Sequence, residues 1–561
     1  MTLDPIDYAI LSQALLAAAR EMGAKLVRSA YSTIVREARD ASTAILDRDG
    51  NIIAQAEMIP IQLGSMGTTL RACLALYPVE TLQEGDFLVN NHPYQGGQHL
   101  QDVFIFTPVF HEGAFIAFSG STAHHLDLGG GGAGLNNSAT DLFQEGLIIP
   151  PTKYSMKRDW FGGTFERLLA ANVRVPDQTL GDFNAQFAAN AIGAERIRQL
   201  CTKYGSTALV AAMADMIQYS ETHLRKAIAA IPDGIYSAED VLDDDGYSDK
   251  PIWVRAKLIV SGETIEVDFA GTDGQSKRNI NAPFASTTSA VLCCIKAALI
   301  GSDVPFNEGS FRPVTVKAPY GSILNPIPPA PVRARMEPCY RAFGAVMKAL
   351  AQALPERIIA PGFDAALIAC LSSFSAGRYR VCLETYGGGF GGGPGNDGAD
   401  GVAAPLSNTT NSPVEALDME FDFFRIVEYS LAPASFGHGA YRGGLGLRRV
   451  YEVLRDDVDF SVYADRFRMP PQGLAGGTQG ALSRCEFWRD GKPFEADAKK
   501  GLLLMTGDRV AVITSGGGGW GDPALRAPAL VERDVEDGLV SHAHASSFYG
   551  WHEETSLKKA S

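Results

Sequence analysis

Apolar residues recur at helical spacing near the start of the chain. Asp4 followed by Pro5 is a typical N-cap with proline at the first helical position. The apolar positions that follow share one helical face: Leu11, Leu15, Met22 and Leu26. The pattern predicts an amphipathic helix at the N-terminus. A second long helix of the same kind is predicted from about residue 207 to residue 230.

Two segments have the pattern of hairpins. The first has strands at 42–46 and 51–54 around an Asp-rich turn ending in Gly50. The second has apolar runs at 103–110 and 114–122, joined by a short turn. If that turn centres on Glu112, Asp102 lies opposite residues 122–124, at the open end of the hairpin.

Beyond residue 235 the sequence pattern becomes typical of strands, with strand-like runs at 253–260, at 264–269 and again at 500–514. The glycine-rich segment 385–412 is predicted to be an extended loop. Regular alternation of strands and helices is missing, so we expect an α+β protein of several subdomains with mostly antiparallel sheets and flanking long helices. We divide it into an N-terminal region (1–235), a central α+β region (236–384) and a C-terminal region rich in glycine and strands (385–561).

Composition narrows the class of function. The 561 residues carry a formal net charge of −15, which leaves no basic surplus for a nucleic-acid backbone. The N-terminus lacks a targeting pattern, no apolar run is long enough to span a membrane, and eight cysteines form no CxxC pair. We therefore expect a cytoplasmic protein without a membrane or nucleic-acid partner.

The second hairpin carries the candidate chemistry. His99, Asp102 and His124 fall at its open end, and imidazole nitrogen with carboxylate oxygen is a usual ligand set for a divalent metal. The alternative is structural, because histidine and aspartate also cap strand ends and satisfy loop backbone. His111 lies at the opposite, turn end and is expected to be exposed. Spacing alone leaves the two interpretations open.

The same segment resembles a known family, and the resemblance extends along most of the chain. The blocks that carry it are, in chain order, REARDAS (36–42), GGQHLQDV (96–103), AHHLDLGG (123–130), DFAGT (268–272), NAP (281–283), NSPVE (411–415), YRGGLG (441–446) and GGGGWGDP (516–523). They resemble the hydantoinase B / 5-oxoprolinase family, which is related to lactamases and to subunits of acetone and acetophenone carboxylases.

The resemblance implies a metal site. In the family a divalent metal is held by an HxxD pair, a later histidine and an aspartate from the earlier block, which correspond here to Asp40, His99, Asp102 and His124. The implied metal is zinc or manganese, with iron as a further candidate. His125 and Asp127 are the remaining, catalytic candidates: neighbouring side chains alternate sides, so one histidine would be the ligand and the other would orient a ligand or protonate a leaving nitrogen.

The resemblance also implies a function. The chain would be the metal-containing subunit of an ATP-dependent hydrolase that opens hydantoin, oxoproline or lactam rings. A separate ATP-binding A subunit (HyuA-like) would phosphorylate the cyclic amide, in an (αβ)2 assembly; the chain itself has no GxxxxGK[ST] loop for ATP. Two alternatives stay open: a subunit of an ATP-dependent ketone carboxylase that uses bicarbonate, and a non-catalytic scaffold subunit.

Overall fold

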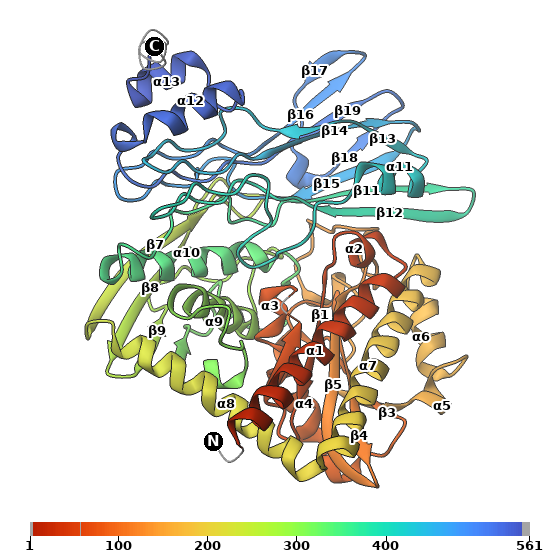
Figure 1. Ribbon diagram of the computed structural model, residues 1–561. Helices are drawn as coiled ribbons and strands as arrows, with labels where there is room; N and C mark the ends of the chain where they lie inside the picture. Colours follow the sequence, from red (N-terminus) through yellow and green to blue (C-terminus); the bar gives the residue numbers. More distant parts are fainter. Residues whose placement is uncertain (1–3, 57, 553–561) are drawn as a thin grey trace. The chain divides into compact units, whose positions relative to one another are not determined.

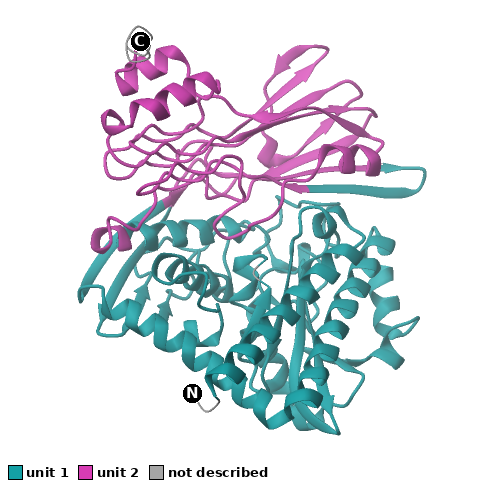
Figure 2. Ribbon diagram, viewed as in Figure 1, with its two compact units in different colours: residues 1–240, 253–349, 374–383 teal, residues 241–252, 350–373, 384–561 magenta. Residues whose placement is uncertain are grey.

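A computed structural model describes residues 4–56 and 58–552 of the chain. Its contacts divide the chain into two compact units, each assembled from segments that are distant in sequence (Figure 2). Unit 1 comprises residues 1–240, 253–349 and 374–383, and unit 2 comprises residues 241–252, 350–373 and 384–561. The predicted division into three regions stays a prediction. Within the described residues, every helix is too short or too polar to cross a bilayer.

Unit 1 is built on a six-stranded antiparallel sheet with the order β2-β1-β5-β4-β3-β6. Its strands are β1 (Ala41–Leu46), β2 (Ile52–Ala56), β3 (Asp86–Asn90), β4 (Asp102–His111), β5 (Ala114–His124) and β6 (Thr152–Ser155). The two hairpins predicted from the sequence are therefore confirmed as β1–β2 and β4–β5, and they lie side by side because β1 pairs with β5.

Helices cover both faces of this sheet (Figure 1). Phe104 and Phe106 of β4 pack in one core cluster with the helix α4 (Met66–Leu76), whereas the intervening Val103 and Ile105 pack in another with Phe183. Phe183 belongs to α7 (Pro176–Tyr204), which packs against β4, β5 and α1 (Pro5–Ser29). Burial on both faces explains why the strand is a continuous apolar run in the sequence.

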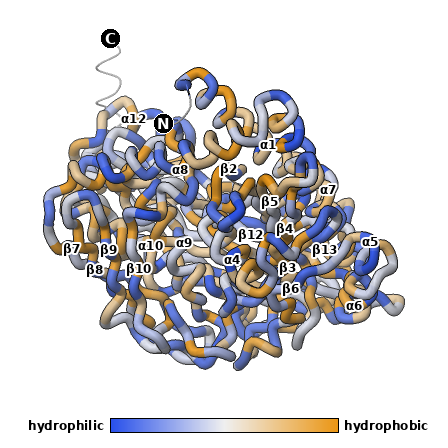
Figure 3. Tube along the Cα trace, turned by 90° about the horizontal axis from the view of Figure 1, so that it is seen from below, coloured by the Kyte–Doolittle hydropathy of each residue, from blue (hydrophilic) through white to orange (hydrophobic). Residues whose placement is uncertain are grey.

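The helix α1 confirms the first prediction. The Asp4 side chain accepts a hydrogen bond from the Ile6 N–H, and the predicted apolar stripe is buried. Hydrophobic and hydrophilic positions alternate along its trace, as expected for a helix that buries one face (Figure 3). The remaining helices of this part of the chain are α2 (Thr33–Arg36), α3 (Pro60–Leu63), α5 (Met156–Asp159), α6 (Thr164–Asn172), α8 (Ser206–Ala229), α9 (Phe284–Leu299) and α10 (Met336–Ala353).

A second sheet has the order β10-β9-β8-β7, in which β8 and β9 are antiparallel and β9 and β10 are parallel. Its strands are β7 (Gly234–Leu242), β8 (Ile252–Ser261), β9 (Thr264–Asp268) and β10 (Val314–Lys317). The helix α8 contacts β9 and α9 contacts β10. The predicted helix near 207–230 is thus confirmed as α8.

The C-terminal part of the chain is rich in strands. One sheet has the order β13-β14-β19-β16-β17, all antiparallel, and another the order β12-β11-β15-β18. Their bounds are β11 (Ile368–Ser375), β12 (Arg378–Thr385), β13 (Phe424–Leu431), β14 (Leu447–Val453), β15 (Val458–Tyr463), β16 (Arg484–Arg489), β17 (Lys492–Phe494), β18 (Leu502–Leu504) and β19 (Arg509–Ile513). Three helices complete it: α11 (Val414–Glu420), α12 (Pro528–Glu536) and α13 (His542–Tyr549).

Glycine-rich segments of unit 2 pack backbone against backbone. The N–H of Gly389 donates to the Ser515 carbonyl at 3.0 Å, and the N–H of Gly517 donates to the Gly444 carbonyl at 2.9 Å. A Cβ at Gly389 would lie 1.9 Å from the Gly444 oxygen, and one at Gly517 would lie 2.0 Å from the Phe390 oxygen. Only glycine allows chains to approach this closely, so the predicted loop at 385–412 is extended but tightly packed.

The α+β class with mostly antiparallel sheets is confirmed. Three long helices escape the sequence pattern: α7, α9 and α10. In α9 the apolar residues surround almost the whole helix, which leaves no amphipathic period to detect.

Candidate functional site

The ends of three neighbouring strands bring the predicted ligands together. Asp102 begins β4 and is paired in register with His124, which ends β5. Asp40 directly precedes β1, and its carbonyl accepts a hydrogen bond from the His124 N–H at 3.0 Å. The residue before it, Arg39, has a φ of 59°, which is unusual for a residue other than glycine. The sheet therefore holds the three residues at neighbouring strand ends, and the hairpin register predicted this for Asp102 and His124.

Side-chain contacts join these residues into one cluster. The Gln62 amide donates to Asp40 Oδ1 at 2.9 Å and to Asp102 Oδ1 at 3.0 Å. His99 Nδ1 lies 3.1 Å from Asp102 Oδ2, and the rings of His99 and His124 are 5.0 Å apart. Asp102 and both histidines are buried, whereas Asp40 is half-buried. All four predicted ligands thus belong to the same polar cluster.

Burial and charge give the two carboxyl groups opposite protonation. Burial, together with the nearby Asp102 charge, raises the pKa of Asp40 to about 8. Burial acts on Asp102 in the same direction, but His99 and the Arg335 guanidinium hold its pKa below the usual range. The pair therefore shares one proton at neutral pH, and that proton resides on Asp40.

The two histidines are neutral. Burial, followed by the Arg335 charge, lowers the pKa of His99 to about 4. Burial also lowers the pKa of His124 well below its ordinary value, with further contributions from His99 and from the Arg333 charge. Neutral imidazole is the form that ligates a metal.

A buried arginine accompanies the carboxylates. The Arg335 guanidinium contacts Asp102 Oδ2, and its Nε and Nη2 donate to the side-chain oxygen Oε1 of Gln98 at 3.1 and 2.8 Å. The Gln98 amide in turn donates to Ser65 Oγ at 2.9 Å. These hydrogen bonds fix the Arg335 side chain in place.

The segment that carries Arg335 is anchored by Glu145. This buried carboxylate accepts hydrogen bonds from the backbone N–H groups of Val332 at 3.0 Å and Arg333 at 2.9 Å. Burial raises the pKa of Glu145 to about 7. Glu145 therefore holds the backbone of residues 332 and 333, just before Arg335.

The cluster fits a divalent metal in its donor chemistry. It contains two carboxyl groups and two neutral imidazoles, and the buried His124 Nδ1 has no hydrogen-bond partner. Across residues 4–56 and 58–552, however, no three His, Cys, Asp or Glu side chains form a set arranged to hold an ion. In the structure the carboxylate oxygens are contacted instead by Gln62 and Arg335. Metal binding at this cluster is therefore kept as a proposal.

The remaining candidates, His125 and Asp127, contact other parts of the chain. The ring of His125 lies 4.4 Å from that of Phe183, and its Nε2 lies 2.9 Å from the Gln186 side-chain oxygen. Asp127 Oδ1 accepts a hydrogen bond from Arg174 Nη1 at 2.9 Å. A catalytic role for either residue stays a prediction. His111, at the far end of the hairpin, is half-buried.

Comparison with known proteins decides the family. The model of the family described as hydantoinase B/oxoprolinase matches residues 4–523. The chain belongs to the hydantoinase B/oxoprolinase family. It is 33% identical to the B subunit of a putative D-/L-hydantoinase from a Pseudomonas species, over 98% of this chain and 95% of that protein. It is 30% identical to the beta subunit of the caprolactamase of Pseudomonas jessenii, over 98% and 96% of the two chains.

Solved structures extend the comparison to the fold. A crystal structure of the ATP-dependent caprolactamase from Pseudomonas jessenii superposes with a TM-score of 0.90 at 29% identity, covering 100% of this chain and 99% of the other. An acetone carboxylase in its nucleotide-free form superposes with a TM-score of 0.87 at 19% identity, covering 98% and 79%. The second likeness concerns the fold alone.

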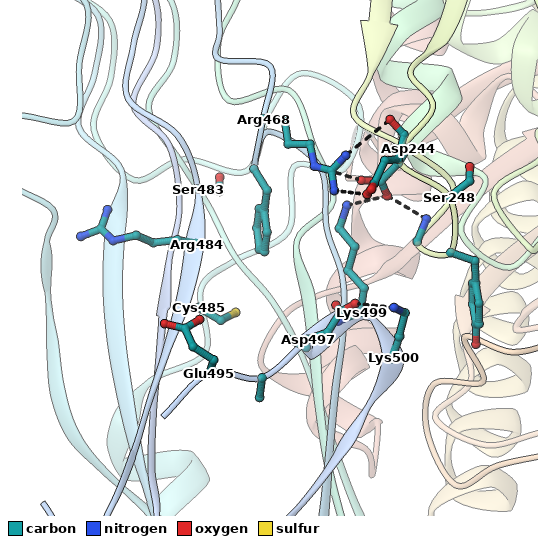
Figure 4. Close-up of a pocket in the computed structure, with 16 residues that line it drawn as sticks. Asp244, Ser248, Arg468, Ser483, Arg484, Cys485, Glu495, Asp497, Lys499 and Lys500 are labelled. Atoms are coloured by element: carbon teal, nitrogen blue, oxygen red, sulfur yellow. Dashed lines mark hydrogen bonds and ion pairs between the residues drawn. The ribbon is translucent and has the colours of Figure 1, made fainter. Parts of the chain in front are cut away.

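Unit 2 of this hydantoinase B-type chain contains a cavity of about 520 Å³ (Figure 4). Lys499 Nζ lies 3.0 Å from Asp244 Oδ1, and Arg468 contacts Asp249. Lys500 and Arg484 pair in the same way with acidic neighbours, Asp497 and Glu486. Each of these four cations is thus paired with a carboxylate.

Several polar residues around the site were missed by sequence reasoning: Gln62, Gln98, Gln186, Arg333 and Arg335. Gln98 lies inside the block GGQHLQDV, so its proximity to His99 was a usable signal. The two arginines lie more than 200 residues away, at 333 and 335, in a proline-rich stretch that precedes an apolar helix. Charged residues directly before a buried helix are unusual, and this is the signal that could have identified the two arginines.

Proposed function

We propose that this chain is the metal-carrying subunit of an ATP-dependent enzyme that opens cyclic amides of the hydantoin, oxoproline or lactam type. The observation that carries the proposal is relatedness along nearly the whole chain to a hydantoinase subunit and a caprolactamase subunit. The chemistry of the cluster at the ends of β4 and β5 supports the proposal. Two carboxyl groups and two neutral imidazoles are suited to a hard or borderline divalent ion.

Asp40, His99, Asp102 and His124 would hold this ion, with zinc or manganese as the leading candidates and iron as a third. When bound, the ion would supply Lewis-acid activation of water for attack on the substrate. The protein side chains have tasks of their own. Gln62 holds the two carboxyl groups in fixed orientation, and Arg335 keeps Asp102 ionised. The paired strands fix the positions of the ligands that lie at their ends.

The overall reaction needs activation, because an unstrained amide is a poor electrophile. The partner transfers the γ-phosphoryl group of ATP to the amide oxygen, which releases ADP. Water then adds to the former carbonyl carbon, the C–N bond breaks, and the nitrogen leaves after accepting a proton, as an amine from a lactam or oxoproline and as a carbamoyl nitrogen from a hydantoin. A second water removes the phosphate from the resulting acyl phosphate. The balance is one ring, one ATP and two waters giving a ring-opened carboxylate, ADP and phosphate; the carboxylate is an amino acid from a lactam or oxoproline and an N-carbamoyl amino acid from a hydantoin.

The nucleotide would belong to the partner. The chain has no Walker-type phosphate loop, and the two relatives above are themselves named as the B or beta component of an enzyme. We therefore propose an ATP-binding A subunit in an (αβ)2 assembly. A cytoplasmic location stays a prediction.

The test is to co-express the chain with its partner and assay hydantoins, lactams and ketones, with and without ¹³C-bicarbonate and in H₂¹⁸O. Ring hydrolysis predicts an ATP-dependent, ring-opened carboxylate product that contains ¹⁸O and no bicarbonate carbon. Bicarbonate carbon in a stable product from a ketone would replace the proposal with carboxylation. Full activity of a variant that carries His99→Ala and His124→Ala would instead favour a scaffold role for this subunit.

A further inference from the structure

Arg333 is a buried cation whose guanidinium lacks an ion-pair partner. Its exposed fraction is 6%, and its backbone N–H is bonded to Glu145. Among the residues that the structure describes, none accepts a hydrogen bond or forms an ion pair with its guanidinium. Arg335, two residues further on, has both Asp102 and Gln98 as acceptors. Of the two arginines, Arg335 is therefore paired, whereas the guanidinium of Arg333 is not.

The neighbours of Arg333 compensate its charge only weakly. The electrostatic neighbours of Arg333 include His99 and His124, whose side chains cannot supply a negative charge. The Asp102 carboxylate of the same cluster is already engaged by Arg335 and Gln62. The charge of Arg333 also reaches Glu145, but both oxygens of that carboxylate accept from backbone N–H groups. A buried cation without a partner is costly, and proteins retain such groups where a ligand supplies the missing charge.

The segment that carries Arg333 is fixed on both sides. The Tyr94 hydroxyl donates to the Ala330 carbonyl at 2.7 Å, and the Asn281 amide donates to the Pro331 carbonyl at 2.9 Å. The N–H of Ala334 donates to the Asn279 carbonyl at 2.9 Å. A guanidinium on such a rigid segment loses little freedom when it binds, which is the condition for a preorganised anion site.

We propose that Arg333 binds the phosphoryl group of the activated substrate beside the cluster of Asp40, His99, Asp102 and His124. The inference rests on the function proposed above and names what this part of the site recognises. The planar guanidinium offers two parallel N–H donors to a phosphate. An unactivated hydantoin or lactam ring is neutral and gains nothing from this charge, whereas the phosphorylated ring carries two negative charges. Arg333 thus discriminates the activated substrate from the unactivated one.

Binding is tested on the full-length chain without its partner, using inorganic phosphate as the probe and thermal unfolding with calorimetric titration as readouts. Phosphate is expected to raise the Tm of the wild type by about 2 °C or more at saturating concentration, because it binds the folded state alone. Arg333→Met should abolish the shift, and Arg333→Lys should retain part of it. Arg312→Met is the matched control, since Arg312 is exposed and paired with Glu221, and its shift should equal that of the wild type.

The same variants separate a ligand-binding role from a structural one. Removing an uncompensated buried cation should leave the Tm of ligand-free Arg333→Met unchanged or raise it by about 1–3 °C. A fall in Tm of several degrees would show that Arg333 stabilises the fold, and would overturn the inference. Equal shifts with phosphate, bicarbonate and acetate would overturn the assignment to a phosphoryl group.

Turnover by the assembled enzyme supplies an independent readout. Arg333→Met should lower kcat/KM for ring opening by on the order of 100-fold, the usual effect of losing one donor to a developing or bound oxyanion. It should also raise the ratio of ADP released to ring-opened product, because the phosphorylated substrate would be lost to solvent. An unchanged ratio with full activity would overturn the inference while leaving ring hydrolysis intact. Phosphate binding that depends on Arg333 in an enzyme that carboxylates ketones would instead overturn the proposed function alone.

Discussion

The two carboxyl groups of the cluster should respond in opposite ways to the same substitution in the metal-free chain. Asp40 is protonated at neutral pH, so Asp40→Asn replaces one neutral group by another of the same shape and should change the free energy of unfolding by less than about 1 kcal/mol at pH 7. Asp102 is ionised and contacts the Arg335 guanidinium. Asp102→Asn leaves that cation unpaired and should cost about 3–5 kcal/mol.

The pH dependence gives a second signature of the same arrangement. An acid with a raised pKa in the folded state binds a proton that the unfolded chain lacks, so stability falls as pH rises from the unfolded pKa to the folded one, here from about 4 to about 8. His99 and His124 have lowered pKa values and act oppositely, mainly below about pH 7, and they do so in Asp40→Asn as well as in the wild type. Between pH 6.5 and 7.5 the wild type should therefore lose up to about 1 kcal/mol that Asp40→Asn does not lose.

Calorimetry in the presence of a chelator measures both effects. For a cooperative unit of roughly 350 residues, 1 kcal/mol corresponds to about 1.5 °C in Tm. Asp102→Asn should thus unfold about 4–7 °C below the wild type, and Asp40→Asn within about 1.5 °C of it. Partial contact of Asp40 with solvent can only reduce its pH effect. Equal losses in the two variants, or equal pH slopes for Asp40→Asn and the wild type, would refute the assignment of the shared proton.

Three further outcomes are expected. The purified protein should contain about one divalent ion per chain by elemental analysis, and an active enzyme without stoichiometric metal would contradict this. His99→Ala or His124→Ala should remove the ion and lower the Tm, because an ion that binds the folded state adds stability. The isolated chain should neither bind ATP nor hydrolyse it, as measured by calorimetric titration and by a coupled ADP-release assay. Substantial ATP turnover without the partner would overturn the assignment of the nucleotide to the partner subunit. Gly517→Ala should cost about 3 kcal/mol or more, because the new Cβ would overlap the Phe390 carbonyl; Gly274→Ala, whose nearest atom is 3.9 Å away, is the control and should unfold like the wild type.

The parts of the site that lie within one hairpin could be predicted from the sequence. Hairpin register depends on the turn and on alternation, so the pairing of Asp102 with His124 could be worked out from residue numbers alone. Asp40 required more, because its place beside His124 follows from the pairing of β1 with β5, which joins two separate hairpins. The resemblance to the family supplied that long-range relation.

Other parts could not be predicted from local patterns. Gln62 bridges two carboxyl groups from a four-residue helix that has no periodicity of its own, and Arg335 reaches Asp102 across 233 positions of sequence. The glycine segments of unit 2 have neither helical nor strand periodicity, and their structure depends on contacts with one another. Each of these features is defined by tertiary packing, where single-sequence reasoning has least to offer.

The charges of the site bear on which substrate it accepts. Without a metal, the cluster of Asp40, His99, Asp102 and His124 has one ionised carboxylate, Asp102, against the two cations Arg333 and Arg335, because Asp40 and the histidines are neutral. Apart from Glu145, whose pKa is about 7, these groups therefore carry a positive excess of one. A divalent ion that displaced the Asp40 proton would add two positive charges against one new negative charge, and so would increase that excess to two. A phosphorylated ring with two negative charges would neutralise it, bicarbonate would neutralise half, and a neutral amide none. Under the proposed function, electrostatic complementarity would therefore favour a substrate that arrives already activated, and the order of the two chemical events would depend on this subunit as well as on its partner.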